Sequence, residues 1–233
     1  MRLYYMTSHE VAVKRILPER RMKLSLFSDL NDPFELKPYA LADKLLRRVN
    51  RALEREYFGK KGILCFSDNW LSPVMWAHYA DKHRGVCLGF DVGELAGESL
   101  AHPVSYSPAR LHFELDLTKD LMGIDEQYVR ALLHAKAEQW SYEREYRVVA
   151  NLEVQDEKTG FYYVEFGDQL QLREIIIGAR NEMPVGQMAK LVRGNGAAVQ
   201  VLKARPGFHQ FEVVRDRGVK AINVPGKRKR SSA

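Results

Sequence analysis

The fold of this chain is organised around residues 62–91, which read GILCFSDNWLSPVMWAHYADKHRGVCLGFD. The apolar run at residues 63–66 predicts a short strand that ends at the turn-forming residues after it. Ser72 followed by Pro73 is typical of a helix N-terminus, because the hydroxyl can cap the first turn and proline loses no hydrogen bond there. After a helix-ending glycine, residues 86–90 predict a second strand. The stretch therefore predicts a strand, a capped helix and a second strand.

The predicted helix has an unusual composition for a core helix. Trp76 and Tyr79 share one face, and His78 lies beside that face. Tryptophan and tyrosine each bring a polar atom that needs a partner when the ring is buried. Two interpretations remain open at this point: large core side chains whose polar tips are satisfied, or side chains that line a binding site.

Working outward, the 233 residues are enough to bury a substantial core. The alternation of short strands and helices predicts an α+β fold with mixed or antiparallel sheets and packed helices. We expect one domain over residues 1–219 and a flexible basic tail over residues 220–233. No apolar run approaches the roughly 18 residues of a membrane span. The first residues resemble a strand rather than an apolar secretory segment, so we expect no export signal. Cys65 and Cys87 lie in apolar strands, which favours free thiols and a cytoplasmic location.

The net charge of +6 is concentrated near the C-terminus. Residues 1–179 carry 24 Lys/Arg against 27 Asp/Glu, whereas residues 180–233 carry 12 against 3. A basic segment of this kind can attract nucleic acid or an acidic protein acceptor. It can equally be a solvated end that keeps the protein in solution.

A second informative stretch is SYEREYRVV at residues 141–149. If the chain is extended from Tyr142 onward, Glu143, Glu145 and Arg147 point to one face. Two neighbouring carboxylates repel each other unless a cation or a reacting group uses them. The stretch is therefore either a surface ion-pair ladder with Arg147 or part of a site. The residues before it, 125–140, predict a long helix.

A loop at residues 27–35, FSDLNDPFE, carries several carboxylates. The Asn-Asp-Pro sequence is a strong turn signal, and one interpretation is that Asp32 simply holds the turn. The loop also places Asp32 and Glu35 near each other, in the kind of segment that often carries function.

Several motifs together resemble a known family: LYYMT, NDPFE, CFS, MWAHYADKHRGVCLGFD, YEREYR and EIIIGAR. In this order they resemble an uncharacterised bacterial family of domain-of-unknown-function proteins associated with phage defence. The resemblance runs from residue 3 to about residue 180.

The order of motifs is also similar, at a greater distance, to that of ADP-ribosyltransferases. Those enzymes have a first strand with a hydroxyl, a middle strand followed by a tyrosine-bearing helix, and a late strand with a catalytic glutamate. The resemblance implies an ADP-ribosyltransferase-like fold and NAD as a small nucleotide ligand. Its catalytic residues would be Glu145, Glu143 and Tyr79, with Glu145 stabilising an oxocarbenium-like cation. The expected NAD-binding side chains are Tyr5, Thr7, Ser67, Trp76, His78 and Arg147.

The sequence thus predicts an NAD-using transferase or glycohydrolase, acting as a toxin or antiphage effector. One alternative is a metal-dependent nuclease or phosphodiesterase, although no segment has a recognised metal-ligand spacing. Its hard ligands would be drawn from Asp32, Glu35, Asp68, His78, His83, Glu143 and Glu145. A second alternative is a non-enzymatic module that senses a nucleotide or a protein.

Overall fold

The computed structural model describes residues 1–116, 118 and 124–227. The chain divides into two compact units, and each is described here by itself. Unit 1 comprises Met1–Met22, Phe66–Leu100 and the chain from Val164 onward, whereas unit 2 comprises Lys23–Cys65 and Ala101–Tyr163. Three strands contain a unit boundary: β2 Arg21–Lys23, β4 Lys61–Ser67 and β12 Tyr163–Glu165. The single domain expected over residues 1–219 stays a prediction.

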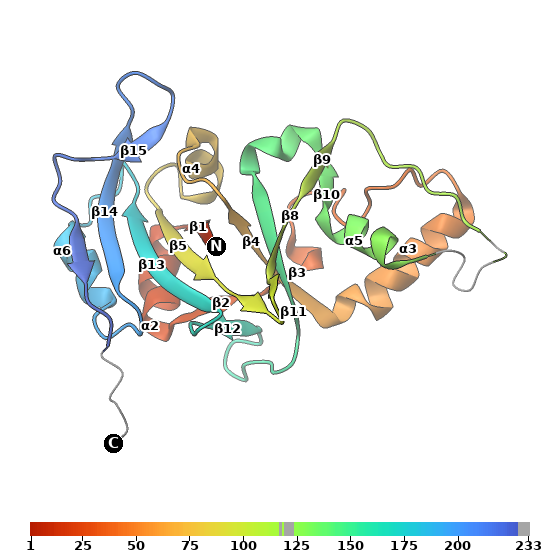
Figure 1. Ribbon diagram of the computed structural model, residues 1–233, viewed down its shortest axis with the longest axis horizontal. Coiled ribbons are helices and arrows are strands. Elements are labelled where there is room, and N and C mark those ends of the chain that lie inside the picture. Colours follow the sequence, from red (N-terminus) through yellow and green to blue (C-terminus); the bar gives the residue numbers. More distant parts are fainter. Residues whose placement is uncertain (117, 119–123, 228–233) are drawn as a thin grey trace. The chain divides into compact units, whose positions relative to one another are not determined.

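Unit 1 is built on a sheet with helices packed against it. Its elements are β1 Arg2–Thr7, α1 His9–Val11, α2 Leu17–Glu19, α4 Pro73–Tyr79, β5 Val86–Val92, β6 Glu94–Leu95, β7 Glu98–Ser99, β13 Leu170–Ile177, α6 Val185–Leu191, β14 Val199–Pro206, β15 Val213–Arg215 and β16 Ile222–Val224. The main strands lie in the order β15-β14-β13-β5-β1 (Figure 1). Only β13 and β14 in this series run parallel, with α6 as their crossover helix. The expected α+β class with a mixed, largely antiparallel sheet is confirmed.

The centre of this sheet explains the apolar runs in the sequence. Leu3, Leu88 and Ile176, on β1, β5 and β13, are each fully buried. Strands covered on both faces contain nearly continuous apolar residues rather than an alternating pattern. The strand predicted over residues 86–90 is confirmed as β5, and the apolar run EIII forms the end of β13.

The sheet extends further along the chain than expected. β16 pairs with β14 through Val199↔Val224 and Val201↔Ile222, so Ile222–Val224 is an ordered edge strand inside the stretch expected as a tail. Backbone pairing along the free edge of β14 orders this segment, although its composition is not strongly apolar. The basic run at residues 227–230 lies largely outside the described residues.

The capped helix of the central stretch is confirmed. The Ser72 hydroxyl accepts a hydrogen bond from the Met75 N–H at 3.4 Å. The helix ends at Tyr79, earlier than expected, and is followed by residues with φ of 45°, 51° and 70° at positions 81–83. Gly85 completes this turn because a Cβ there would come within 2.2 Å of the Thr7 carbonyl oxygen. Only glycine lets the chain pass this close to β1 and enter β5.

Unit 2 contains the remaining elements: β3 Ser25–Leu26, α3 Lys44–Glu56, β8 Ala101–Pro103, β9 Ser105–Ser107, α5 Glu126–His134, β10 Ala135–Ala137, a 3-10 helix Glu138–Glu143 and β11 Glu145–Asn151. The helix predicted over residues 125–140 is wrong after His134. There the backbone leaves α5 to pair in parallel with β9, through Ala135↔Ser105 and Ala137↔Ser107. Backbone pairing with a distant segment overrides the helical preference of the alanines.

An aromatic cluster stabilises unit 2. The rings of Tyr39 and Tyr128 are stacked with centroids 4.4 Å apart and planes inclined by 1°. The Tyr128 hydroxyl donates to Asn50 Oδ1 at 3.2 Å, and Asn50 Nδ2 donates to the Leu36 carbonyl at 2.9 Å. These bonds satisfy the buried amide of α3. In the described part of the chain, no helix is both long enough and apolar enough to span a membrane.

Candidate functional site: a buried ion network beside a pocket

Among the described residues of unit 2, six charged side chains are almost completely buried. Asp32 lines a pocket described below, and the other five form one set of ion pairs. Lys136, the most exposed of them, has a relative exposure of 9%, and Arg147, the least exposed, 0%. The other members are Glu35, Glu143 and Glu145. Buried charges are stable only when they are paired and hydrogen-bonded. We call this set the ion network.

Arg147 lies at the centre of the ion network. Its Nε donates to Glu145 Oε1 at 2.8 Å, and its Nη2 donates to Glu35 Oε1 at 2.8 Å. Its Nη1 donates to the carbonyl of Leu133 at 2.7 Å. The guanidinium thus joins the NDPFE loop, the end of α5 and β11. The surface ladder considered from the sequence is wrong, because Arg147 and both glutamates point into the interior.

Lys136 is the second cation of the ion network. Its Nζ lies 2.7 Å from Glu143 Oε2, 3.3 Å from Glu145 Oε2 and 3.4 Å from Glu35 Oε1. The same ammonium lies 4.7 Å from the centroid of the Trp140 ring. The expected strand from Tyr142 starts only at Glu145, so Glu143 reaches Lys136 from the last turn of the 3-10 helix.

The charges in the ion network do not cancel. Three carboxylates face two cations when all five groups are ionised. Burial alone would raise the pKa of Glu145, but Arg147 and Lys136 hold it below its ordinary value. For Glu35 burial outweighs the same two cations, and its pKa is raised. Of Glu35 and Glu145, Glu35 therefore takes up a proton more readily.

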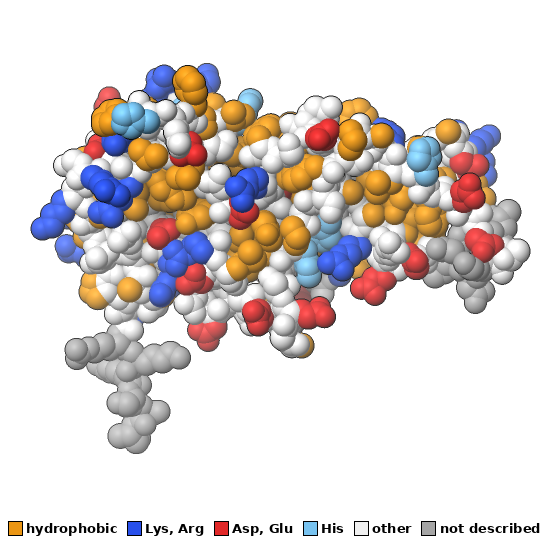
Figure 2. All heavy atoms as spheres, turned by 45° about the horizontal axis from the view of Figure 1, so that its top comes forward, with side chains coloured by type: hydrophobic (Ala, Val, Ile, Leu, Met, Phe, Trp, Pro, Cys, Tyr) orange, Lys and Arg blue, Asp and Glu red, His pale blue; other side chains and the backbone are white. Residues whose placement is uncertain are grey.

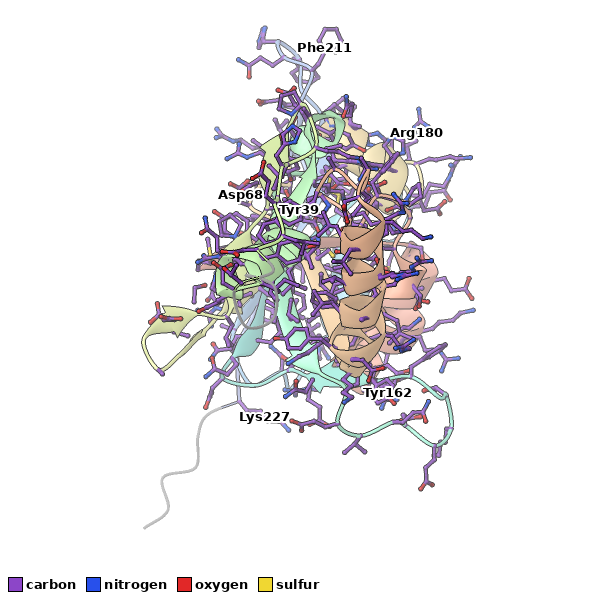
Figure 3. All side chains as sticks on the ribbon, turned by 90° about the vertical axis from the view of Figure 1, so that its right-hand side faces the viewer. Tyr39, Asp68, Tyr162, Arg180, Phe211 and Lys227 are labelled. Atoms are coloured by element: carbon purple, nitrogen blue, oxygen red, sulfur yellow. The ribbon has the colours of Figure 1, made fainter. Side chains whose placement is uncertain are left out.

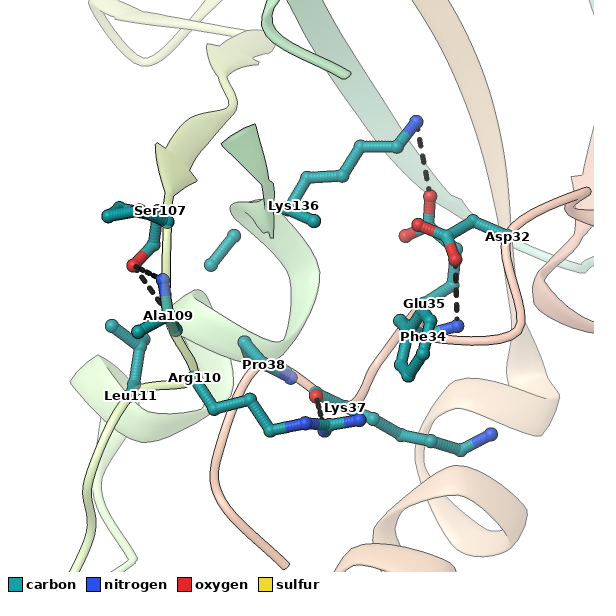
Figure 4. Close-up of a pocket in the computed structure, with 13 residues that line it drawn as sticks. Asp32, Phe34, Glu35, Lys37, Pro38, Ser107, Ala109, Arg110, Leu111 and Lys136 are labelled. Atoms are coloured by element: carbon teal, nitrogen blue, oxygen red, sulfur yellow. Dashed lines mark hydrogen bonds and ion pairs between the residues drawn. The ribbon is translucent and has the colours of Figure 1, made fainter. Parts of the chain in front are cut away.

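A pocket of about 200 Å³ opens beside the ion network. Figure 4 shows Asp32, Glu35 and Lys136 on one side of this pocket, with the carboxylates of Asp32 and Glu35 next to each other. Its lining residues are Asp32, Phe34, Glu35, Lys37, Pro38, Ser107, Pro108, Ala109, Arg110, Leu111, Ala135, Lys136 and Ala137.

Two oxygens of this pocket have no hydrogen-bond partner among the described residues, Asp32 Oδ2 and Glu35 Oε2. The other oxygen of Asp32 accepts from the N–H of Phe34 at 2.9 Å, so the turn role expected for Asp32 uses only half of its carboxylate. Asp32 and Glu35 have relative exposures of only 5% and 8%. A buried oxygen without a partner costs free energy, which a ligand with hydrogen-bond donors or positive charge would recover.

The pocket rim differs from its acidic wall. Phe34 is 55% exposed, and the guanidinium of Arg110 lies 5.0 Å from its ring centroid. Arg110 is held in place by a hydrogen bond from its Nη1 to the Lys37 carbonyl at 2.6 Å. The rim thus combines an aromatic face with positive charge. A ligand with a donor-rich or cationic end and an anionic end matches this polarity.

The predicted site residues fall into two sets. Glu143, Glu145 and Arg147 lie together in unit 2, as described above. The remainder belong to unit 1: Tyr5, Thr7, Ser67, Trp76, His78 and Tyr79. The convergence of both sets in one cleft stays a prediction.

Within unit 1, Trp76 fits the core interpretation. It is 0% exposed, and its Nε1 donates to the carbonyl of Trp70 at 2.6 Å. Its indole also stacks with the His83 ring, with centroids 6.3 Å apart. The Trp76 ring is therefore packed in the interior, and its polar atom has a hydrogen-bond partner. Trp76 anchors α4, and its surroundings give no support to contact with a cofactor.

The other predicted site residues of unit 1 differ in their exposure. Thr7 and Ser67 are buried, and the Ser67 hydroxyl accepts from the Asn69 N–H at 3.2 Å. Tyr5 packs edge-on against Phe66, with centroids 6.1 Å apart. His78 is exposed on α4 and Tyr79 is half-buried next to it.

Sequence reasoning missed Lys136. The helix expected over residues 125–140 included it without any assigned role, whereas the structure places it in β10 with its ammonium in the ion network. One signal was present: Lys136 stands between two alanines in LLHAKAEQW, where an exposed helical face would carry more polar residues.

The metal alternative receives no structural support. The described residues contain no group of three or more His, Cys, Asp or Glu side chains placed to hold a metal ion. Of the seven candidate ligands, Asp68, His78 and His83 belong to unit 1 and the others to unit 2.

Comparison with protein families places part of this region in a matched stretch. Residues 75–148 are similar to a family described as Protein of unknown function (DUF2971). The matched stretch runs from α4 through the 3-10 helix to β11, so it includes Lys136, Glu143 and Arg147. No curated protein and no solved structure matches the chain.

The ion network borders on a histidine that predicts a pH dependence. Burial, followed by the nearby charge of Arg147, lowers the pKa of His134 from 6.5 to about 4. On acidification, His134 is protonated near pH 6.5 in the unfolded chain, but only near pH 4 in the folded chain. The free energy of unfolding should therefore fall as the pH is lowered from about 6.5 to about 4. Urea unfolding across this range should show a shallower fall for His134→Gln than for the wild type. The exposed His112→Gln variant is the control, and equal slopes for the wild type and His134→Gln would refute the assignment.

Proposed function

We propose that the protein is an enzyme that breaks the N-glycosidic bond of a nucleotide, with NAD as the candidate substrate. It would transfer the ADP-ribosyl group to an acceptor or to water, as ADP-ribosyltransferases and NAD glycohydrolases do. The observation that carries the proposal is the pair of buried, unpartnered carboxylate oxygens of Asp32 and Glu35 in the pocket.

The chemistry requires an acid residue at this position. When the bond between the ribosyl C1′ and nicotinamide breaks, the bonding electrons move to the ring nitrogen and nicotinamide leaves uncharged. Positive charge develops on C1′ and the ring oxygen, and a carboxylate in a dry site stabilises it strongly. Asp32 Oδ2 is free to face that charge. Water or the acceptor then bonds to C1′ and loses a proton.

Glu35 is suited to take that proton. Its pKa is raised by burial, which brings its basicity closer to neutral pH. Arg147 Nη2 donates to Glu35 Oε1 at 2.8 Å, whereas Glu35 Oε2 has no hydrogen-bond partner among the described residues. The ion network therefore positions Glu35 through one carboxylate oxygen and leaves the other oxygen available to accept a proton.

This proposal changes the role expected for Glu145. Both of its oxygens are engaged, Oε1 by Arg147 at 2.8 Å and Oε2 by Lys136 at 3.3 Å. A carboxylate in that state has little capacity left for a substrate cation. We therefore assign Glu143 and Glu145 to positioning Lys136 and Arg147, and assign the contact with substrate to Asp32 and Glu35.

The rim fits the remainder of a nucleotide. Phe34 offers a face for a planar ring, and the positive charge of Arg110 and Lys37 favours a pyrophosphate. In this proposal the enzyme works in the cytoplasm, where it consumes NAD or modifies an acidic acceptor held by the basic C-terminal quarter. That is how a toxin or antiphage effector would act.

The first experiment measures binding and turnover separately. Calorimetric titration of the full chain with NAD should show saturable binding, and incubation should release nicotinamide, detected by chromatography. Glu153→Gln, an exposed acid in unit 2, is the matched control and should behave as the wild type. Binding without release of nicotinamide would favour the sensing module, and the absence of both would remove NAD from consideration.

A further inference from the structure

A short loop in unit 1 presents two phenylalanines to solvent. Phe208 is 81% exposed and Phe211 is 99% exposed, both in the connection between β14 and β15. Figure 3 shows Phe211 at the tip of this connection, pointing away from the rest of the chain. The two phenylalanines are three positions apart in one loop, and exposed apolar side chains that gather in this way are a feature of interaction sites. We call residues 205–212 the aromatic loop.

Backbone hydrogen bonds close the base of the aromatic loop. The Gly207 N–H donates to the Glu212 carbonyl at 2.7 Å and closes the loop, while Pro206↔Val213 pairing continues the strands below it. The Val213 N–H is bonded in turn to the Leu71 carbonyl at 2.8 Å. Because the backbone is already ordered, a partner would bind the two rings with little loss of conformational entropy.

One of the two rings has a positive charge against its face. The Arg205 guanidinium lies 3.8 Å from the Phe208 ring centroid, a cation–π arrangement. From Arg205 to Lys220 the chain has four Lys/Arg and two Asp/Glu residues, within a C-terminal quarter that has 12 against 3. Figure 2 shows hydrophobic and basic side chains next to each other on this part of the surface. The charge favours a polyanionic partner.

We infer that the aromatic loop binds single-stranded nucleic acid. Unpaired bases stack on exposed aromatic rings, and arginine supports such stacks while basic residues neutralise phosphates. A duplex hides its base faces, so it could use the charge but not the rings. The surface thus fits a flexible strand with accessible bases better than a double helix.

A membrane surface fits the aromatic loop less well. His209 and Gln210 separate the two phenylalanines, so the tip offers no continuous apolar surface to insert. Residues that anchor proteins at membrane interfaces are chiefly Trp and Tyr, which are absent from the loop. The inference goes beyond the proposed NAD chemistry and does not depend on it.

The test is an anisotropy titration of the full chain, without NAD, using labelled single strands of about 12 nucleotides in DNA and RNA form. Single strands should bind more tightly than the matching duplex, and affinity should fall as salt is raised. The double variant Phe208→Ala/Phe211→Ala should bind roughly five- to a hundredfold more weakly. Arg205→Gln should weaken binding less.

The matched control is Phe161→Ala. Phe161 is 45% exposed and has the Lys23 ammonium 4.0 Å from its ring centroid, but it lies in unit 2. This variant should bind as the wild type. Failure to bind single strands, equal loss in the control, or unchanged binding in the double variant would each overturn the inference. Sedimentation with phosphatidylserine vesicles is run in parallel; if the double variant loses only vesicle binding, the loop is a membrane contact instead.

Discussion

Replacing Glu35 by glutamine is expected to lower the rate of nicotinamide release by roughly 10²–10⁴-fold, the usual contribution of a general base. Glutamine has the same shape, and its amide oxygen can still accept from Arg147 Nη2, but it cannot take up a proton. The free energy of unfolding should not fall, because burial already opposes the ionised form of Glu35. The measurements are steady-state NAD cleavage and urea unfolding of the same preparations.

Two further variants make the result decisive. Asp32→Asn should also slow cleavage, because it removes the charge that faces the developing cation, while its Oδ1 can still accept from Phe34 N–H. The exposed Glu153→Gln should leave the rate unchanged. If Glu35→Gln keeps most of the activity, the assignment of the base is wrong. If Glu145→Gln alone is inactive while folded and able to bind NAD, the role expected from the sequence returns.

Replacing Arg147 by methionine is expected to destabilise the protein by about 3–5 kcal/mol, the cost of leaving buried charges without their partner. Glu35 and Glu145 would then share Lys136 alone. For a chain of this size the loss corresponds to a fall in Tm of roughly 6–20 °C. Thermal unfolding followed by circular dichroism measures it, with the exposed Arg51→Met as the control.

Lowering the pH should reduce the difference in unfolding free energy between the wild type and Arg147→Met. In the wild type the pKa of Glu145 is lowered, so its stabilising contribution is present above the unfolded pKa and is lost as the pH falls through the folded pKa. In Arg147→Met burial dominates, the pKa of Glu145 is raised, and protonation then favours the folded state. The gap between wild type and variant should narrow on acidification. A gap that stays constant with pH would show that lost packing, rather than unpaired charge, causes the destabilisation.

Local sequence patterns predicted much of the framework. The hydroxyl of Ser72 caps α4, the apolar runs form β5 and β13, and the turn signal at Asp32 is used as expected. These features depend on residues within a few positions of each other. The helix predicted through residue 140 failed because β10 pairs with β9, about thirty residues earlier in the chain.

The sequence predicted only part of the candidate site. Spacing grouped Glu143, Glu145 and Arg147 correctly, but it left open whether they face solvent or the interior. The NDPFE loop was noted for its carboxylates without any link to the later stretch. No local pattern could have shown that Glu35 bonds to Arg147, 112 positions further on.

The sequence by itself determined the cap of α4 at Ser72, which runs are apolar, and that positive charge gathers toward the C-terminus. Those properties follow from backbone preferences and from the period of side chains along one element. Only the tertiary structure decided that Lys136 turns inward, that Arg147 is paired twice, and that Asp32 and Glu35 each keep an unpaired oxygen beside a pocket. The physical reason is that burial and ion pairing depend on distances between segments remote in the chain, which local periodicity does not encode.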